Sequence, residues 1–263
     1  MKFQNFFKFR ETGGDQKAFL DHIEDLRLVL MRMAIALGAA MILSFVFRTE
    51  LAAIIQRPLI AVDPSRAANL QSLGVPDSMM ISLEISLYAG LIISFPFLLF
   101  FLGQFVLPGL TPKERKMMLP GATAGFGLFL GGVLFAYFWV LPMTLEFFFE
   151  DAKSMNWQPM WTVREYYSFT TQFIIAFGLA FELPVAILLL VKLELLTVQQ
   201  LRQGRSFALV IIFVLAAIIT PTQDIFTLLL MGGPMYLLYE ICILLAAIME
   251  RKIAKNNNSD KLV

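Results

Sequence analysis

Six apolar stretches separated by polar segments run along the chain. They lie at about residues 28–47, 81–107, 117–145, 166–191, 207–220 and 225–249. A helix crosses the hydrocarbon of a bilayer, about 30 Å thick, with about 20 apolar residues. The fifth stretch has only 14 residues, which cover about 21 Å as a helix. The pattern predicts an all-α, polytopic membrane protein of one domain with six transmembrane helices, and local thinning of the bilayer beside the short helix.

Composition supports a membrane protein and excludes several kinds of site. Of 263 residues, 58% are hydrophobic and 16% are charged, more apolar surface than a soluble core can bury. The chain has one histidine, His22, and one cysteine, Cys242, so neither an internal disulfide nor a thiolate metal site is possible. No nucleophile–base pair, phosphate loop or dinucleotide motif is present. We therefore expect no enzyme activity, no metal, no cofactor and no nucleic-acid partner.

Basic residues gather on one side of the predicted membrane topology. With six spans, the N-terminal segment, the 108–116 loop, the 192–206 loop and the C-terminal tail share a side, and together they carry 16 of the 21 Lys and Arg residues. Short loops rich in Lys and Arg stay in the cytoplasm. The sequence therefore predicts that both termini are cytoplasmic. The tail, about 254–263, is polar and Asn-rich, and we expect it to be disordered.

The fourth apolar stretch contains a single charged residue, Glu182. A carboxylate at the centre of a membrane helix costs about 2.5–3.5 kcal/mol on insertion scales, so it is protonated, paired or facing a polar cavity. Pro184, two residues later, lacks a backbone N–H and weakens the helix at this point. One interpretation is a neutral glutamate that bonds to a neighbouring helix of the same chain. The other is a polar contact for an intramembrane partner.

The polar segment before the first span ends in Asp21-His22-Ile23-Glu24-Asp25-Leu26-Arg27. Asp21 followed by Glu24 fits a capping box at a helix start. This leaves Asp25 unexplained, since Asp21 and Asp25 are a like-charge pair at i and i+4. Either Arg27 or an external cation would relieve that repulsion.

Five motifs in chain order resemble the TatC family, the polytopic receptor subunit of the twin-arginine protein translocase. They are His22–Arg27, Pro108–Leu110 with Glu114–Arg115, Phe181–Pro184, Thr220–Asp224, and Pro234–Tyr236 with Tyr239–Glu240. The resemblance covers nearly the whole chain. Three positions depart from the family pattern: Asp25 stands where the family has glutamate, 101–105 lacks a tryptophan often found there although Phe105 keeps an aromatic ring, and the 220–224 turn is one residue longer.

The resemblance implies a function and its partners. TatC proteins of the bacterial inner membrane bind signal peptides with two consecutive arginines at their cytoplasmic face. They assemble with single-span TatA/TatB-type subunits and other TatC copies, and export folded proteins using the proton-motive force. The implied signal-peptide residues are Glu24, Asp25, Arg27, Phe105, Glu114 and Arg115. The implied partner-subunit residues are Phe181, Glu182, Pro184, Met235 and Glu240.

Two choices follow from these assignments. Consecutive helix residues point about 100° apart, so only one of Glu24 and Asp25 faces a binding groove, and we favour Asp25. Guanidinium groups prefer carboxylates in a bidentate geometry, which suits Asp25 and Glu114. The alternative function is a secondary transporter or channel that uses Glu182 and Glu240 as an ion relay, although the spans hold few polar residues to line a path.

Overall fold

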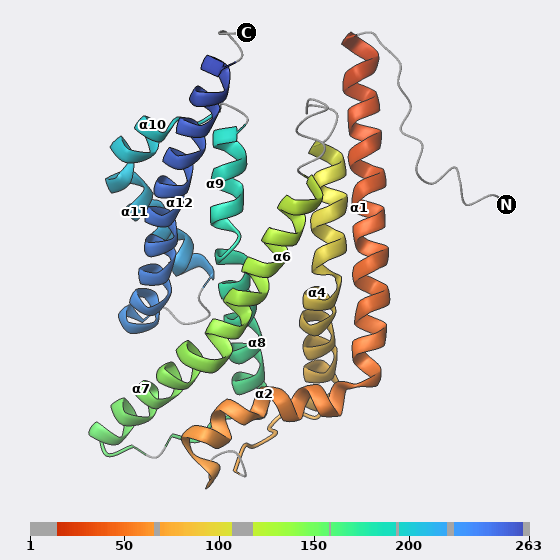
Figure 1. Cartoon of the computed structure of the whole chain (residues 1–263). Coiled ribbons are helices and arrows are strands. Elements are labelled where there is room, and N and C mark those ends of the chain that lie inside the picture. The colour runs from red at the N-terminus through yellow and green to blue at the C-terminus, as the bar shows by residue number, and fades with distance from the viewer. Residues whose placement is uncertain are drawn as a thin grey trace, which may run out of the picture.

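The computed structural model describes residues 15–65, 69–106, 118–157, 159–192, 195–219 and 224–259. Within these ranges the named elements are all helices, and one isolated β-bridge joins Gln71 to Thr162. In chain order they are α1 (Asp15–Val46), α2 (Arg48–Val62), α4 (Asp77–Val106), α6 (Met118–Phe135), the π-helix η3 (Ala136–Val140), α7 (Leu141–Ser154), α8 (Val163–Ala180), α9 (Leu183–Lys192), α10 (Val198–Gln203), α11 (Arg205–Ile219) and α12 (Ile225–Ser259) (Figure 1).

The predicted membrane helices are present. Among the described residues, five helical segments are long and apolar enough to cross a bilayer, and Arg205–Ile218 is a shorter apolar helix. The five are Ile23–Val46, Asp77–Phe105, Pro120–Ser154, Val163–Lys192 and Ile225–Glu250. The all-α, six-helix prediction is therefore confirmed, including the short fifth helix.

Two helices are longer than the apolar pattern indicates. The third continues to Ser154, past the expected end at 145, because η3 carries it on without a break into the amphipathic α7. The last, α12, extends to Ser259, into the segment expected to be disordered, because no Gly or Pro follows its apolar part to end it.

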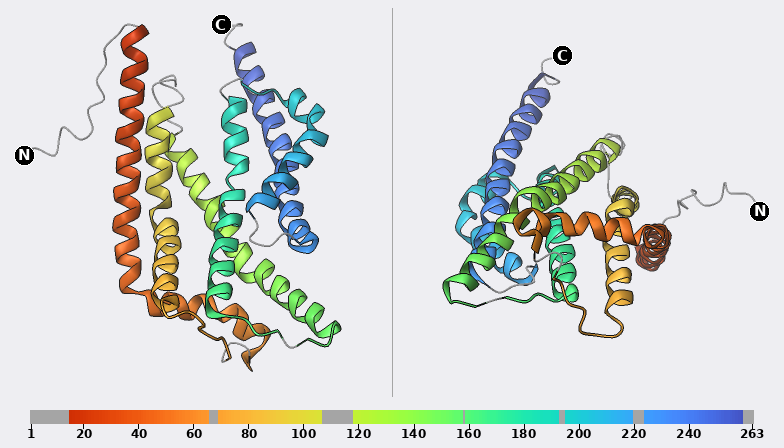
Figure 2. Two further views of the ribbon diagram at one scale, coloured as in Figure 1. Left: turned by 180° about the vertical axis from the view of Figure 1, so that it is seen from behind. Right: turned by 90° about the horizontal axis from the view of Figure 1, so that it is seen from below.

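The start of α1 and the end of α12 lie at the same end of the molecule (Figure 1). We call this end the terminal side, and the opposite end, crossed by α2, the α2 side. Seen from below, α2 runs from the foot of α1 across the bundle towards α7 (Figure 2). An even number of crossings brings the chain back to the side on which it began, which explains this arrangement.

Helix α1 packs along α4 with close backbone contact. A Cβ atom added at Gly90 of α4 would lie 2.8 Å from the backbone nitrogen of Met41 in α1. Val29, Ala40 and Ser44 of α1 are buried, whereas Ile42 is 72% exposed. Gly90 thus lets two membrane helices meet at one point, and the opposite face of α1 is left to lipid.

The centre of the molecule is the crossing of α6 and α8. Phe129 of α6 and Phe173 and Phe177 of α8 are fully buried. A Cβ at Gly132 would lie 2.7 Å from the carbonyl oxygen of Phe177, and one at Gly178 would lie 2.7 Å from the Phe129 ring. Glycine on each helix therefore allows this close crossing, and large aromatic rings fill the space around it.

Tyrosine hydroxyls fasten α2 to the bundle. Pro58 lies inside α2 and has no N–H, so the carbonyl of Ile54, one turn earlier, loses its usual donor. The Tyr137 hydroxyl of η3 donates to this carbonyl at 2.7 Å. Two tyrosines of α8 donate to other α2 carbonyls, Tyr166 to Ile55 at 2.7 Å and Tyr167 to Ala52 at 3.2 Å. Side chains of later spans thus hold a helix that precedes them in the chain.

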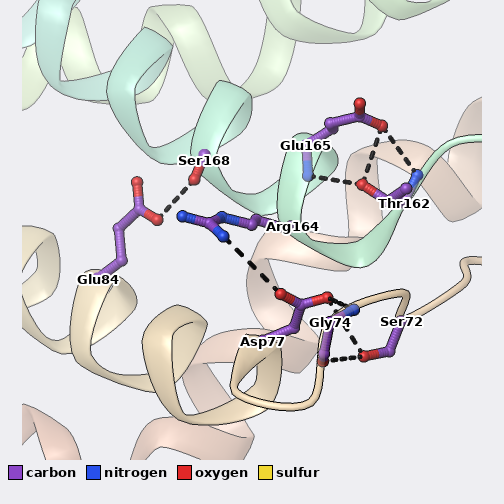
Figure 3. A network of polar contacts seen from close by, with 8 residues as sticks. All are labelled: Ser72, Gly74, Asp77, Glu84, Thr162, Arg164, Glu165 and Ser168. Carbon is purple, nitrogen blue, oxygen red and sulfur yellow. Dashed lines mark hydrogen bonds and ion pairs between the residues drawn. The ribbon is translucent and has the colours of Figure 1, made fainter.

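A polar network joins α4 to α8 on the α2 side (Figure 3). Asp77, at the start of α4 and 4% exposed, accepts from the backbone N–H of Gly74 at 2.6 Å and lies 4.0 Å from the Arg164 guanidinium. Glu84 accepts from the Ser168 hydroxyl at 2.6 Å. These contacts fix the loop before α4 against the start of α8.

Candidate functional site

The fourth span is broken at Glu182. The sequence predicts one helix over 166–191, weakened near Pro184, whereas the structure has two helices, α8 and α9, with Phe181 and Glu182 between them. The Glu182 N–H donates to the Leu179 carbonyl at 3.1 Å, and α9 then begins at Leu183. Pro184 cannot donate to the turn before it, so the chain tightens there and starts a new helix. Glu182 stands at the N-terminus of α9, where the helix dipole favours negative charge.

The carboxyl group of Glu182 lies against α6 and α4. A Cβ built on Gly125 of α6 would be 3.1 Å from Oε2 of Glu182 and 3.1 Å from a methyl carbon of Leu99 in α4. Oε1 is buried and has no hydrogen-bond partner among the described residues. A buried polar atom without a partner costs about 1–3 kcal/mol. Within the described part of the chain, the interpretation that Glu182 bonds to a neighbouring helix is therefore not supported for this atom.

Glu240, in α12, has partners within the chain. Its Oε2 accepts from the Arg205 guanidinium at 2.9 Å, and its Oε1 accepts from the Tyr236 hydroxyl at 3.1 Å. The ion pair with Arg205 joins α12 to the start of α11. Sequence reasoning missed Arg205 as the partner, because the two residues are 35 positions apart and nothing local links them.

The other predicted partner-subunit residues fall into two groups. Phe181 is half-buried beside the ring of Phe135, with ring centroids 5.8 Å apart, and Pro184 is buried at the start of α9. Met235, in α12, is 1% exposed and belongs to the hydrophobic core. The structure thus gathers Phe181, Glu182 and Pro184 at the α8–α9 junction, and places Met235 inside the chain.

At the terminal side, Glu24 and Asp25 have different surroundings. Glu24 accepts from the Arg27 guanidinium at 3.4 Å, and both side chains are exposed. Asp25 is half-buried, one turn before the buried Val29 that faces α4. The expected capping box is wrong, because α1 begins at Asp15 and Asp21 lies within it. No Gly or Pro between these two residues stops the helix from extending back.

The register of α1 and α4 shows what lies beside Asp25. Met41 meets Gly90 where the two helices touch. Asp25 precedes Met41 by 16 positions, about 24 Å along a helix, and the same step along the antiparallel α4 reaches the last residue of α4, Val106. Asp25 is therefore level with the end of α4, next to Phe105 and Val106.

Sequence reasoning missed Gln104, one residue before Phe105. Its side chain is 8% exposed, and its Oε1 atom is buried with no hydrogen-bond partner among the described residues. A polar residue within the second apolar stretch was the available signal. The predicted residues Glu114 and Arg115 lie in the 107–117 connection, outside the described residues, as does the 220–223 part of the turn after α11.

A family profile described as "Sec-independent protein translocase protein (TatC)" matches residues 21–234. The chain belongs to the TatC family. It is 34% identical to the TatC protein of Carboxydothermus hydrogenoformans over 88% of this chain and 93% of that protein. It is 50% identical to the TatC protein of Akkermansia muciniphila over 70% of this chain, a match that spans 53% of that relative's length.

Solved structures agree with this assignment. A crystal structure of the twin arginine translocase receptor TatC is 34% identical, with a TM-score of 0.77 over 86% of this chain and 98% of that chain. A second structure of the same receptor, in DDM, has a TM-score of 0.78. TatC is a component of a protein translocase and not an enzyme family, so the prediction that the chain is not an enzyme is confirmed. Among the described residues, no group of His, Cys, Asp and Glu could hold a metal ion.

Proposed function

We propose that this protein is the receptor and core subunit of a twin-arginine translocase. It binds twin-arginine signal peptides at its terminal side, associates with single-span TatA/TatB-type subunits and further TatC copies, and uses the proton-motive force to export folded proteins. The proposed topology is multi-pass in the bacterial inner membrane, with both termini in the cytoplasm. Membership of the family supports this proposal, together with the 16 of 21 Lys and Arg residues assigned to one side.

The observation that carries the proposal is the position of Asp25. It is half-buried between α1 and α4, level with the end of α4, whereas Glu24 is exposed and engaged by Arg27. A carboxylate held at a helix–helix boundary can accept both N–H groups of one guanidinium in a fixed orientation. Glu114 follows α4 in the sequence, and it is the proposed acid for the second arginine of a signal peptide.

Glu182 is the proposed contact for a single-span subunit. The Glu182 side chain is half-buried and its buried Oε1 atom lacks a partner among the described residues, so a turn of the carboxyl group towards a donor on an incoming helix would relieve the cost of that burial. Gly125 lets the carboxyl group lie close against α6, because a side chain at this position would meet it. Phe181 and Pro184 flank the same junction and would contact the same partner. Met235 and Glu240 stay predictions for this role.

No observation favours the ion-relay alternative. A relay through Glu182 and Glu240 needs both carboxyl groups free to exchange a cation. The guanidinium of Arg205 already neutralises Glu240 at 2.9 Å. The structure therefore gives no reason to prefer transport of a small ion.

Binding of a synthetic twin-arginine peptide to the purified protein in nanodiscs tests the proposal. Asp25→Asn should weaken binding by about 1.5–3 kcal/mol, the range for hydrogen bonds to charged groups, which is about a 10- to 150-fold rise in Kd. Glu24→Gln, the matched control next to it, should change Kd little. No binding of the peptide by the parent protein would contradict the receptor role, and the reverse order of the two variants would overturn the choice of Asp25.

A further inference from the structure

A cavity of about 560 Å³ lies on the α2 side, apart from Asp25 and Glu182. Its lining comes from α2, α4, α6, η3, α7 and α8, and is mostly apolar. Residues that represent these walls are Leu51 and Arg57 of α2, Ile85 and Ala89 of α4, Leu134 of α6 and Ile174 of α8. None of the residues assigned above to the signal peptide or to partner subunits lines this cavity, so it needs a separate explanation.

The cavity spans the depth of one leaflet. Ile85 and Ile92 follow the first residue of α4, Asp77, by 8 and 15 positions, or about 12 and 22 Å along the helix. Half of a bilayer's hydrocarbon is about 15 Å thick. Leu134 and Phe138, which also line the cavity, are 45% and 60% exposed, so it opens sideways between the helices. An occupant would therefore enter from the leaflet on the α2 side.

The polar groups of the lining indicate the chemistry of that occupant. The hydroxyls of Tyr137 and Thr171 already donate to backbone carbonyls of the chain. Arg57 is exposed and forms no hydrogen bond or ion pair with another described residue, and the Tyr88 hydroxyl likewise has no such partner. A guanidinium at the edge of an apolar cavity, with no partner in the described part of the chain, suits a molecule with a hydrocarbon tail and an anionic head.

We propose that this cavity binds an anionic phospholipid from the leaflet on the α2 side, with an acyl chain inside and the phosphate against Arg57. Charge favours a lipid over an apolar helix of another protein, because the phosphate would supply Arg57 with the anionic partner that it lacks among the described residues. This inference goes beyond the proposed receptor function and does not depend on it.

Photolabelling tests the site directly. The full-length protein is placed in phosphatidylcholine vesicles with a trace of phosphatidylglycerol that carries a diazirine on its acyl chain, and labelled peptides are located by mass spectrometry. Label should concentrate in 85–92 and 133–138. Arg57→Gln should lower the yield about five-fold, or about 1 kcal/mol, as expected for one cation near an anionic head group. Arg57→Lys keeps the positive charge and should retain most of the labelling. Lys153→Gln removes an exposed positive charge on α7, outside the cavity, and should not change the labelling.

A second pair of variants tests the hydrocarbon part of the site. Ala89→Phe fills the cavity and should abolish the label, whereas Ala53→Phe, on the exposed face of α2 and outside the lining, should not. If Ala89→Phe fails to fold, Leu134→Trp narrows the opening and should reduce the label instead. The proposal is overturned if a phosphatidylcholine probe labels the cavity equally, if label is spread evenly over all lipid-facing helices, or if a protein helix is captured there in place of lipid.

Discussion

Replacing Gly132 with alanine should loosen the junction that holds Glu182, whereas the same change at Gly131 should not. A Cβ at Gly132 would lie 2.7 Å from the carbonyl oxygen of Phe177 and 2.8 Å from the ring of Phe181. A Cβ at Gly131 would meet no atom within 4 Å. The two glycines are consecutive in α6, so they form a matched pair that differs only in what each one faces.

The size of the effect follows from these distances. Ordinary contact begins near 3.4 Å, and the Cβ of alanine at 132 would lie 2.7 Å from the Phe177 oxygen, so the two atoms must move apart by about 0.7 Å. A backbone carbonyl cannot rotate away as a side chain can. Overpacking of this kind costs about 1–3 kcal/mol. Alanine also gains about 0.5–1 kcal/mol over glycine within a helix, a gain that both variants share. Gly132→Ala should therefore be less stable than Gly131→Ala by about 1–3 kcal/mol.

Thermal unfolding of the detergent-solubilised protein measures this difference. One kcal/mol shifts Tm by about 2–4 °C for chains of this size, so Gly132→Ala should melt about 2–12 °C below Gly131→Ala. Displacement of Phe181 also moves Glu182, so crosslinking from position 182 to a single-span subunit should fall in Gly132→Ala alone. Equal melting temperatures for the two variants would refute the close crossing of α6 and α8.

Three carboxylates give further tests. Glu182→Ala should weaken crosslinking to a single-span subunit and stop export in cells, while Glu182→Gln should retain more of both; equal loss would count against a hydrogen-bonding role. Glu114→Gln should weaken binding of a twin-arginine peptide by about 1.5–3 kcal/mol in a fluorescence anisotropy titration, and affect a twin-lysine peptide much less. Asp77→Ala leaves the Gly74 N–H without its acceptor and should lower the free energy of unfolding by about 1–3 kcal/mol, measured by melting; an unchanged Tm would contradict this.

The membrane helices could be predicted because their signal is local. Each span is a run of apolar residues in the sequence, and the short length of 207–220 can be read from that run alone, without knowledge of the helices that pack beside it. The break at Glu182 was visible only in part. Pro184 indicated a weak point, but whether a proline bends a helix or divides it depends on what packs around it, here Phe135 and Gly132 of the third span.

Contacts between distant parts of the chain could not be predicted. Tyr137 and Tyr166 bond to carbonyls of α2 that are 83 and 111 positions earlier, and no periodic pattern reports such a pair. A capping box at Asp21 predicts too late a start for α1, because the residues from Asp15 to Leu20 are also compatible with a helix. The preference for Asp25 over Glu24 stays a prediction, to which the structure adds a difference in burial and in pairing.

The fastening of α2 by tyrosines has a consequence for the order of events during synthesis. The Ile54 carbonyl accepts from the hydroxyl of Tyr137, which is synthesised 83 residues later, and the Ile55 carbonyl accepts from that of Tyr166, 111 residues later. At about 5–20 residues per second, the ribosome needs roughly 4–22 s to make these donors after α2 has emerged. During that interval α2 has neither the hydroxyl that replaces the N–H missing at Pro58 nor the spans against which it packs. A nascent chain halted before Tyr137 should therefore expose α2 to proteases, and one extended past Tyr167 should protect it.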